Sequence, residues 1–422
     1  MSRSEIICHN FGQYGVFLFD RERSLNILLR KKKRMKLFYW LVFACFLCNL
    51  TADFAFGQSQ IKRIDGSKIS PEKVSAEIRQ IVANAKITGL SVVIVNDNRI
   101  VYRDFFGFRD KQTHSKNDQE TVRYAASLTK PLFAYAFLKL VEKNVFDLDK
   151  PIASYLKKPI GEYEKWKELA NEKEFGKITA RMLLSHSSGL PILRQLYNNK
   201  LSIIASPNTR FYYSNEGMNL LGFVVEEHTG QKLEDIIKET VFEPLDMNRS
   251  GMIWQKEFEN NYAVGYDKSE NLIGAQKRTS SRAAGSMVTT TDDYARFVIA
   301  TMKKQGLSRK TFNEMLTTQM EVASEKAFGP QRDRFTNKFK NIKLGWGLGW
   351  GIFETDSGKS FFHGGHTEGW QNYCVAYPGK KIAVVLMSNS DNFEPVADKI
   401  LDVSIKDTQS PLEWSGYFDQ QN

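Results

Sequence analysis

Cysteine is scarce in this chain, so disulfide bonds can contribute little to its stability. The 422 residues include four cysteines, of which Cys8, Cys45 and Cys48 precede residue 50. If this N-terminal segment is removed, only Cys374 remains, so the rest of the chain can form neither an internal disulfide nor a cysteine–histidine metal cluster. We therefore expect no metal and no cofactor. Cys374 stands in an alternating, strand-like run and is expected to be buried and inert.

Signatures of several large enzyme classes are also missing. The sequence contains no G-x-S-x-G turn, no H-E-x-x-H pair, no P-loop and no G-x-G-x-x-G that opens a helix. Internal repeats and low-complexity segments are absent too, which argues against a structural or adhesive protein. What remains is a chain long enough to bury an active-site helix in one large domain or two.

The excess of positive charge is smaller than it first appears. The formal net charge is +11, but residues 1–34 carry eight Lys or Arg and three Asp or Glu, which gives +5, and residues 35–57 carry one of each. The remainder, +11 − 5 − 0 = +6, is spread over a long chain with acids and bases interspersed. This pattern is typical of a solvated surface, so we expect no nucleic-acid partner.

Residues 31–57 have the pattern of an export signal. A basic stretch from Lys31 to Lys36 precedes an apolar run, residues 37–50, and Ala55 to Gly57 form a small-x-small cleavage site. We expect a mature chain that begins near Gln58 and is periplasmic or secreted, and Met35 is a candidate start of translation. The alternative is an uncleaved membrane anchor over residues 37–56, although polar residues interrupt it.

The remaining pattern predicts an α+β fold. Residues 87–95 and 99–106 resemble a hairpin, and residues 344–353, 361–363, 370–377 and 381–387 resemble further strands. Helices are predicted over 220–228, 233–241, 292–302 and 393–405. We expect one catalytic domain over 58–410, in which an antiparallel sheet built from both chain ends (about 61–125 and 340–406) is flanked by helices. A mostly helical region (about 126–339) is inserted, and 411–422 form a tail.

The first candidate for chemistry is a serine followed by a lysine three residues later. S-x-x-K occurs four times, beginning at Ser59, Ser70, Ser127 and Ser154. Only Ser127 precedes a run that is apolar on nearly every side, residues 132–141, which predicts a buried central helix. Pro131 fits the first turn of that helix. Lys130 shares a helix face with Ser127, so its amine can reach the hydroxyl.

This placement would activate Ser127. Free backbone N–H groups at a helix start favour negative charge, as on a developing oxyanion. Burial would lower the pKa of Lys130 from about 10.4 and make it a proton acceptor. The plainer interpretation is that Ser127 is only a helix cap and Lys130 a surface side chain.

Two further clusters could complete an acyl-transfer site. Tyr213 and Asn215 lie where a loop meets a predicted helix, so the phenol could relay a proton and the amide could bind a substrate amide. His363, Gly364 and Gly365 end a predicted strand, where glycines permit close approach of a substrate. The N–H of His366 could join that of Ser127 in an oxyanion hole. The plainer interpretations are a packed tyrosine, an asparagine cap and a glycine-rich turn.

Together, these clusters resemble those of the β-lactamase-related serine hydrolases, namely class C β-lactamases, D-alanyl-D-alanine carboxypeptidases and esterase relatives. The resemblance spans about residues 70–400 and includes residues 183–191, 243–247 and 283–297. It implies that Ser127 attacks a carbonyl, that Lys130 and Tyr213 share proton transfer, and that water releases a covalent acyl-enzyme. Asn215 matches the substrate-positioning asparagine, whereas the segments containing His186 and Ala283 resemble scaffold.

One departure from the family pattern concerns the substrate. β-Lactamases and penicillin-binding members usually carry lysine where this chain has His363, and that lysine meets the substrate carboxylate. Esterase and peptidase relatives often have histidine there. We therefore expect hydrolysis of a small ester, or of a D-amino-acid peptide or amide. The alternatives are a penicillin-binding or cell-wall-peptide sensor that does not turn over, and a true class C-like β-lactamase. The sequence does not indicate an oligomeric state.

Overall fold

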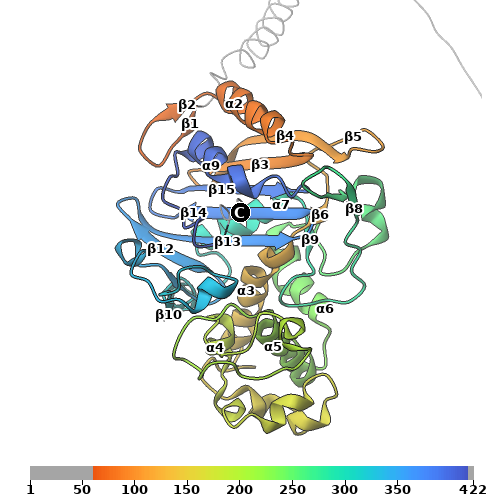
Figure 1. Cartoon of the computed structure of the whole chain (residues 1–422), viewed down its shortest axis with the longest axis vertical. Coiled ribbons are helices and arrows are strands. Elements are labelled where there is room, and N and C mark those ends of the chain that lie inside the picture. Colours follow the sequence, from red (N-terminus) through yellow and green to blue (C-terminus); the bar gives the residue numbers. More distant parts are fainter. Residues whose placement is uncertain (1–59, 417–422) are drawn as a thin grey trace, which may run out of the picture. The chain divides into compact units, whose positions relative to one another are not determined.

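The structure of the protein is a computed structural model that describes residues 60–416. The predicted export signal and its cleavage site lie outside these residues. In the described part, no helix has the length and apolar character needed to cross a bilayer. The central element is a nine-stranded antiparallel sheet (Figure 1). Its strands, in spatial order, are β10 (Met320–Glu321), β11 (Gly345–Trp346), β12 (Gly351–Thr355), β13 (Gly358–Thr367), β14 (Trp370–Tyr377), β15 (Ile382–Ser388), β3 (Gly89–Asn96), β4 (Arg99–Asp110) and β5 (Ser115–Lys116).

The sheet is built from both parts of the sequence that were predicted to form it. β15 pairs with β3 along its whole length, from Ile382 opposite Asn96 to Ser388 opposite Leu90. Asp97 and Asn98 link β3 to β4 with φ values of +51° and +59°, which a tight hairpin turn with two left-handed residues requires. The predicted α+β architecture is therefore confirmed.

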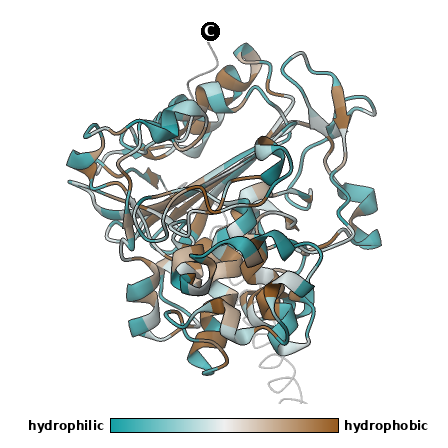
Figure 2. Cartoon of the chain, turned by 60° about the horizontal axis from the view of Figure 1, so that its bottom comes forward, coloured by the Kyte–Doolittle hydropathy of each residue, from teal (hydrophilic) through white to brown (hydrophobic). Residues whose placement is uncertain are grey.

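Both faces of the sheet are buried, because β3 sends alternate side chains to two hydrophobic cores. Val92 and Ile94 enter the core beneath α2 (Pro71–Asn84) and α9 (Ala397–Ile405). Val93 and Val95 enter the other core, which includes α3 (Thr129–Glu142) and α7 (Thr291–Met302). Figure 2 shows hydrophobic residues in the strands and hydrophilic ones on the outer turns of the surrounding helices.

The middle of the chain supplies most of the helices. These are α3, α4 (Ala180–Leu184), α5 (Asn215–Thr229), α6 (Leu233–Ile237), α7 and α8 (Arg309–Met315). Gly230 ends α5 in the left-handed conformation at φ +72°, and the Thr290 side chain caps α7 by accepting from the Asp293 N–H. Three short strand pairs lie beside the sheet: β1 with β2 (Ile61–Lys62, Lys68–Ile69), β6 with β9 (Arg123–Tyr124, Val288–Thr289) and β7 with β8 (Gly265–Tyr266, Leu272–Gly274).

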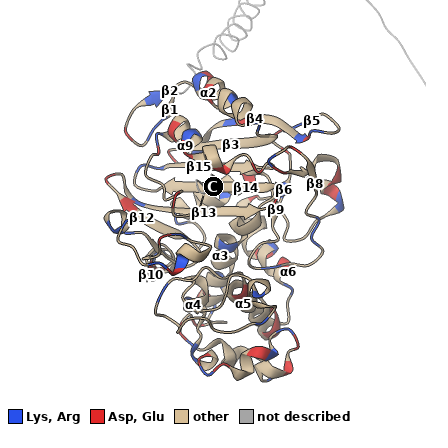
Figure 3. Ribbon diagram, viewed as in Figure 1, with Lys and Arg blue, Asp and Glu red and all other residues tan. Residues whose placement is uncertain are grey.

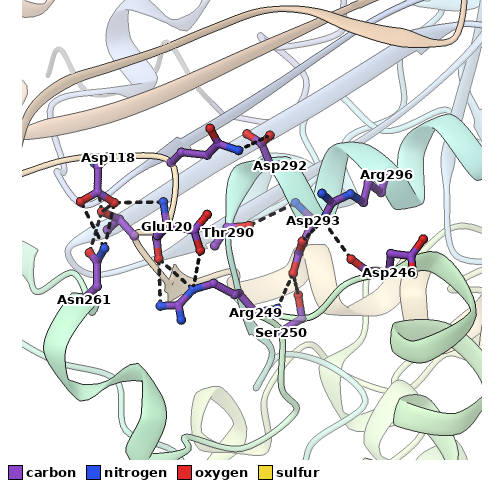
Figure 4. A network of polar contacts seen from close by, with 12 residues as sticks. Asp118, Glu120, Asp246, Arg249, Ser250, Asn261, Thr290, Asp292, Asp293 and Arg296 are labelled. Carbon is purple, nitrogen blue, oxygen red and sulfur yellow. Dashed lines mark hydrogen bonds and ion pairs between the residues drawn. The ribbon is translucent and has the colours of Figure 1, made fainter. Parts of the chain in front are cut away.

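A buried polar network surrounds the start of α7 (Figure 4). The Asp293 carboxylate accepts from the Arg249 backbone N–H at 2.8 Å, from the Ser250 hydroxyl at 2.9 Å and from the Arg296 guanidinium at 2.5 Å. The Arg249 side chain donates in turn to the Glu120 carbonyl at 3.0 and 3.1 Å. These bonds connect the segment before β6 with the helical region. Elsewhere, charges of both signs are interspersed over the face seen in Figure 3.

Several boundaries differ from the expectations. The expected strand over 344–353 is divided into β11 and β12, and the helix expected over 233–241 continues from residue 238 as a wider π-helical turn. Residues 161–176, whose many Glu and Lys side chains predict one or two charged helical turns at the surface, form short 3₁₀ turns, and Trp166 within them is fully buried. Residues 411–416, which were expected to belong to a tail, pack against the fold through Leu412 and Trp414.

Candidate active site

Ser127 lies in a short 3₁₀ turn, Ala126–Leu128, that leads directly into α3. The preceding Ala126 has a φ of +48°, which costs a residue with a side chain about 1 kcal/mol or more. This conformation is held by Thr129, whose hydroxyl donates to the Ala126 carbonyl at 2.6 Å and accepts from the Met287 N–H at 3.2 Å. The strained turn leaves Ser127 half-exposed, although both of its neighbours are buried.

Lys130 is fully buried one turn further along α3, as its apolar surroundings predicted. Its amine lies 2.8 Å from the Ser127 hydroxyl oxygen and donates to the Ala284 carbonyl at 2.7 Å. Among the ion pairs of residues 60–416, none involves Lys130. Burial without a carboxylate partner lowers the pKa of Lys130 well below its ordinary value of 10.5. A deprotonated amine has a free electron pair that can accept the serine proton.

Tyr213 covers this amine, with its ring centroid 4.7 Å from the Lys130 nitrogen. Burial raises the pKa of the Tyr213 phenol, and contact with the Ser127 hydroxyl opposes this shift only in part. Ser214 fixes the position of Tyr213: its hydroxyl caps α5 through the Gly217 N–H at 2.8 Å, and its own N–H donates to the imidazole of His186 at 3.1 Å. Because its pKa is raised, the Tyr213 phenol stays protonated. It can donate this proton to a leaving group if a neighbouring group returns one to it.

Asn215 is the first residue of α5 and lines the same pocket as Ser127 and Tyr213. Its backbone N–H donates to the Ile192 carbonyl at 3.1 Å, which anchors the residue. The side-chain oxygen is buried and accepts no hydrogen bond from the described residues. Since an unpaired buried acceptor is costly, this oxygen suits a donor that a ligand would bring.

Strand β13 passes close to the turn that carries Ser127. A Cβ atom at Gly365 would lie 2.5 Å from the Ala125 carbonyl oxygen, so only glycine fits at this crossing. β12 pairs with β13 only as far as Phe362, whereas β14 pairs with it as far as Thr367. From residue 363 to 367, β13 therefore has one edge without a strand partner among the described residues, and Ser127 and His366 both line the pocket there.

His363 is buried and neutral in this setting. Burial lowers its pKa to about 3. Its Nδ1 atom lies 2.6 Å from the Gly364 carbonyl, and because a carbonyl only accepts, Nδ1 carries the proton. The Nε2 atom is then an acceptor, and it has no partner in the described part of the chain. His363 thus offers a substrate an electron pair rather than a positive charge.

His366 differs from His363, because its ring contacts a carboxylate. Nδ1 of His366 lies 2.8 Å from the buried Glu394 carboxylate, which raises the pKa of this imidazole. Both residues line the pocket, and Glu394 is the only acidic residue that does so, while no lysine or arginine lines it. A protonated His366 would balance the charge of Glu394 within the pocket wall.

The pocket has a volume of about 360 Å³ and a largely aromatic wall. Its lining residues are Ser127, Ile192, Tyr213, Asn215, Ala327, Phe328, Trp346, Phe362, His363, Gly364, Gly365, His366, Glu394, Trp414, Ser415 and Gly416. The structure thus gathers seven of the eight predicted site residues around one pocket, and Lys130 lies directly beneath it. No group of three or more acidic, histidine or cysteine side chains within residues 60–416 is arranged to hold a metal ion.

Some contributors to the site were missed in the sequence. The segments around His186 and Ala283 were expected to be scaffold. In the structure, the His186 ring is tilted against that of Tyr213, with 4.3 Å between their centroids, and the Ala284 carbonyl accepts from the Lys130 amine. No sequence pattern indicates Glu394 or Trp414 either, because neither lies near a predicted site residue in the sequence. For His186, a clue was available in its position within a segment that resembles the family.

Comparison with known proteins agrees with this geometry. The chain is 23% identical over 337 residues to penicillin-binding protein 4* of Bacillus subtilis, covering 71% of this chain and 68% of that protein. It is 24% identical over 355 residues to a D-aminopeptidase of Brucella anthropi, covering 80% of this chain but 63% of the relative. An octameric penicillin-binding protein homologue from Pyrococcus abyssi matches the structure with a TM-score of 0.65 at 25% identity, over 82% of this chain and 79% of that one. Residues 74–405 match the Beta-lactamase family model, and the chain therefore belongs to the β-lactamase family.

Proposed function

We propose that this protein is a serine hydrolase that forms a covalent acyl-enzyme on Ser127. The observation that carries the proposal is the buried Lys130 amine, which has no carboxylate partner within residues 60–416 and lies 2.8 Å from the Ser127 hydroxyl. A neutral amine at that distance can take the serine proton as the oxygen attacks a carbonyl carbon. The names of the relatives, a penicillin-binding protein and a D-aminopeptidase, support the same class of chemistry.

In the first half of the reaction, Ser127 forms a bond to the carbonyl carbon and its proton moves to Lys130. The backbone N–H groups of Ser127 and His366 would stabilise the oxyanion, since the open edge of β13 faces the pocket. Tyr213 then gives its proton to the leaving oxygen or nitrogen and regains one from Lys130. In the second half, water attacks the acyl carbon, one proton returns to Ser127, and the acid is released.

We propose a small ester, or a D-amino-acid peptide or amide, as the substrate. A substrate carboxylate would find neither lysine nor arginine in the pocket lining, and the pKa of about 3 leaves His363 without charge. The unpaired Oδ1 of Asn215 would accept from a substrate N–H. Efficient hydrolysis of β-lactams, which carry a carboxylate, fits this pocket less well. The signal predicted over residues 31–57 would place the activity outside the cytoplasm.

Labelling with a fluorophosphonate and hydrolysis of 4-nitrophenyl acetate test the proposal. Wild type should be labelled and should turn over, whereas Ser127→Ala should do neither. Ser154→Ala is the matched control, because Ser154 begins another S-x-x-K but is exposed; it should behave as wild type. Labelling of Ser127→Ala at the wild-type rate would refute the assignment. A burst of product equal to the enzyme concentration, without steady turnover, would instead indicate a sensor.

A further inference from the structure

The last described segment of the chain, residues 411–416, is built into the pocket. Trp414 is 1% exposed and lies among aromatic rings of the pocket, with its ring centroid 6.1 Å from that of Trp346 and 6.3 Å from that of Phe362. Ser415 and Gly416 line the pocket beside it. This segment follows α9, and its Leu412 and Trp414 belong to the same hydrophobic core as that helix.

A second segment, residues 322–328, is hydrogen-bonded to Trp414 and to its neighbour Glu413. The Ala327 N–H donates to the Trp414 carbonyl at 2.8 Å, and the Trp414 indole N–H donates to the Ser324 hydroxyl at 3.2 Å. The Lys326 amine donates to the carbonyl of Glu413 at 3.1 Å. Three hydrogen bonds thus join two segments that are almost ninety residues apart.

The joined segments close the pocket next to the reacting groups. Ala327 and Phe328 line the pocket, and the Phe328 ring stands edge-on to that of Tyr213 at 5.1 Å between centroids. Phe328 is nevertheless 42% exposed, so its packing against Tyr213 is not enforced by a surrounding core. Its position follows from the backbone of Ala327, and that backbone is bonded to Trp414.

We propose that Trp414 is a specificity-determining residue that limits the size of the acyl group accepted beside Ser127. Its indole occupies volume in the pocket wall, and its hydrogen bonds hold Phe328 over Tyr213. The inference rests on the proposed hydrolase function and adds to it the restriction to short acyl groups. Replacing the indole with a methyl group would open space at the wall and remove the bond to Ser324, while the backbone bond from Ala327 to Trp414 would remain.

The test measures kcat/KM for 4-nitrophenyl esters from acetate to octanoate. Trp414→Ala should raise the ratio of the octanoate to the acetate value about 10-fold or more, because a few methylene groups in an apolar pocket discriminate by that much. Trp350→Phe is the matched control, since Trp350 is also fully buried but does not line the pocket; its ratio should equal that of wild type.

Trp414→Phe decides the question if Trp414→Ala does not fold. Phenylalanine keeps an aromatic ring but loses the bond to Ser324, so the octanoate to acetate ratio should rise about 3-fold. An unchanged ratio in a folded Trp414 variant would overturn the inference. Failure of the proposed function has a different signature, in which wild type neither hydrolyses any of the esters nor is labelled on Ser127.

Discussion

The helices α3 and α7 each have a buried ionisable side chain in their first turn, and their surroundings give the two side chains opposite roles. Asp293, in the first turn of α7, is 3% exposed, and Lys130, in the first turn of α3, is not exposed at all. The positive end of a helix dipole favours the carboxylate of Asp293 and disfavours an ammonium at Lys130. Asp293 also has three donors, whereas Lys130 faces a carbonyl and a hydroxyl.

The first turn of a helix can thus hold a buried ionisable residue that contributes to stability or one that takes part in chemistry. Burial raises the pKa of Asp293, and the donated hydrogen bonds and Arg296 oppose that shift only in part. Nothing comparable opposes the effect of burial on Lys130, and its pKa falls far below 10.5. We therefore expect Asp293 to contribute to stability, and Lys130 to reduce stability while making Ser127 reactive.

The largest expected effect comes from Lys130→Met. Methionine has a similar length and no amine, so kcat/KM for a 4-nitrophenyl ester should fall by about 10²- to 10⁴-fold through loss of proton transfer. The free energy of unfolding should stay the same or rise, because a buried polar group is replaced by an apolar one. Urea titration and ester hydrolysis on the same preparation would measure both.

Lys157→Met is the matched control for that variant. Lys157 completes the S-x-x-K that begins at Ser154, but it is exposed, so both activity and stability should remain at wild-type values. Unchanged turnover in Lys130→Met would mean that Lys130 is a structural residue.

Asp293→Ala should do the reverse of Lys130→Met: it should lower stability and leave activity unchanged. Removing the carboxylate leaves the buried Ser250 hydroxyl and the Arg249 N–H without this acceptor, which should lower the free energy of unfolding by about 1–3 kcal/mol. At temperatures where the variant is folded, kcat should match wild type. Asp235→Ala, in the exposed first turn of α6, should change unfolding by less than about 0.5 kcal/mol. A loss of kcat in folded Asp293→Ala would contradict the division of roles.

The smallest expected effect is a change in the free energy of unfolding with pH. At a pH between the lowered folded pKa of Lys130 and 10.5, the unfolded chain binds a proton that the folded protein does not. Stability should therefore rise with pH in this window, by about 1.4 kcal/mol per unit from this group. The rise should be absent in Lys130→Met, so the difference between the two unfolding curves isolates it. Parallel curves would show that Lys130 is charged when folded.

Sequence alone indicated most of the fold and only part of the site. β3, β14 and β15 are buried on both faces and stood out as short β-branched or aromatic runs, and α3 stood out as an apolar helix. Ser127 and Lys130 could be paired locally, because residues three apart share a helix face. Tyr213 and His363 could be named as candidates from their local sequence, but no local rule places such distant segments beside Ser127.

Ala284 and Trp414 could not be identified from the sequence for related physical reasons. Ala284 acts through its backbone carbonyl, which no side-chain pattern reveals, and Trp414 is placed by hydrogen bonds to Ser324 and Ala327 that form only in the folded chain. The expected tail from residue 411 was inferred from the end of a helical pattern, and periodicity carries no information on where the following residues pack.

The contact at Gly365 has a practical consequence for engineering this protein. Since even one added carbon at this position would meet the Ala125 carbonyl at 2.5 Å, any substitution must push the strand away from the segment that presents Ser127. Randomised libraries that include residue 365 would consist mostly of inactive clones. Diversity is better introduced at Phe328 and Ser415, where side chains border the pocket without supporting that crossing.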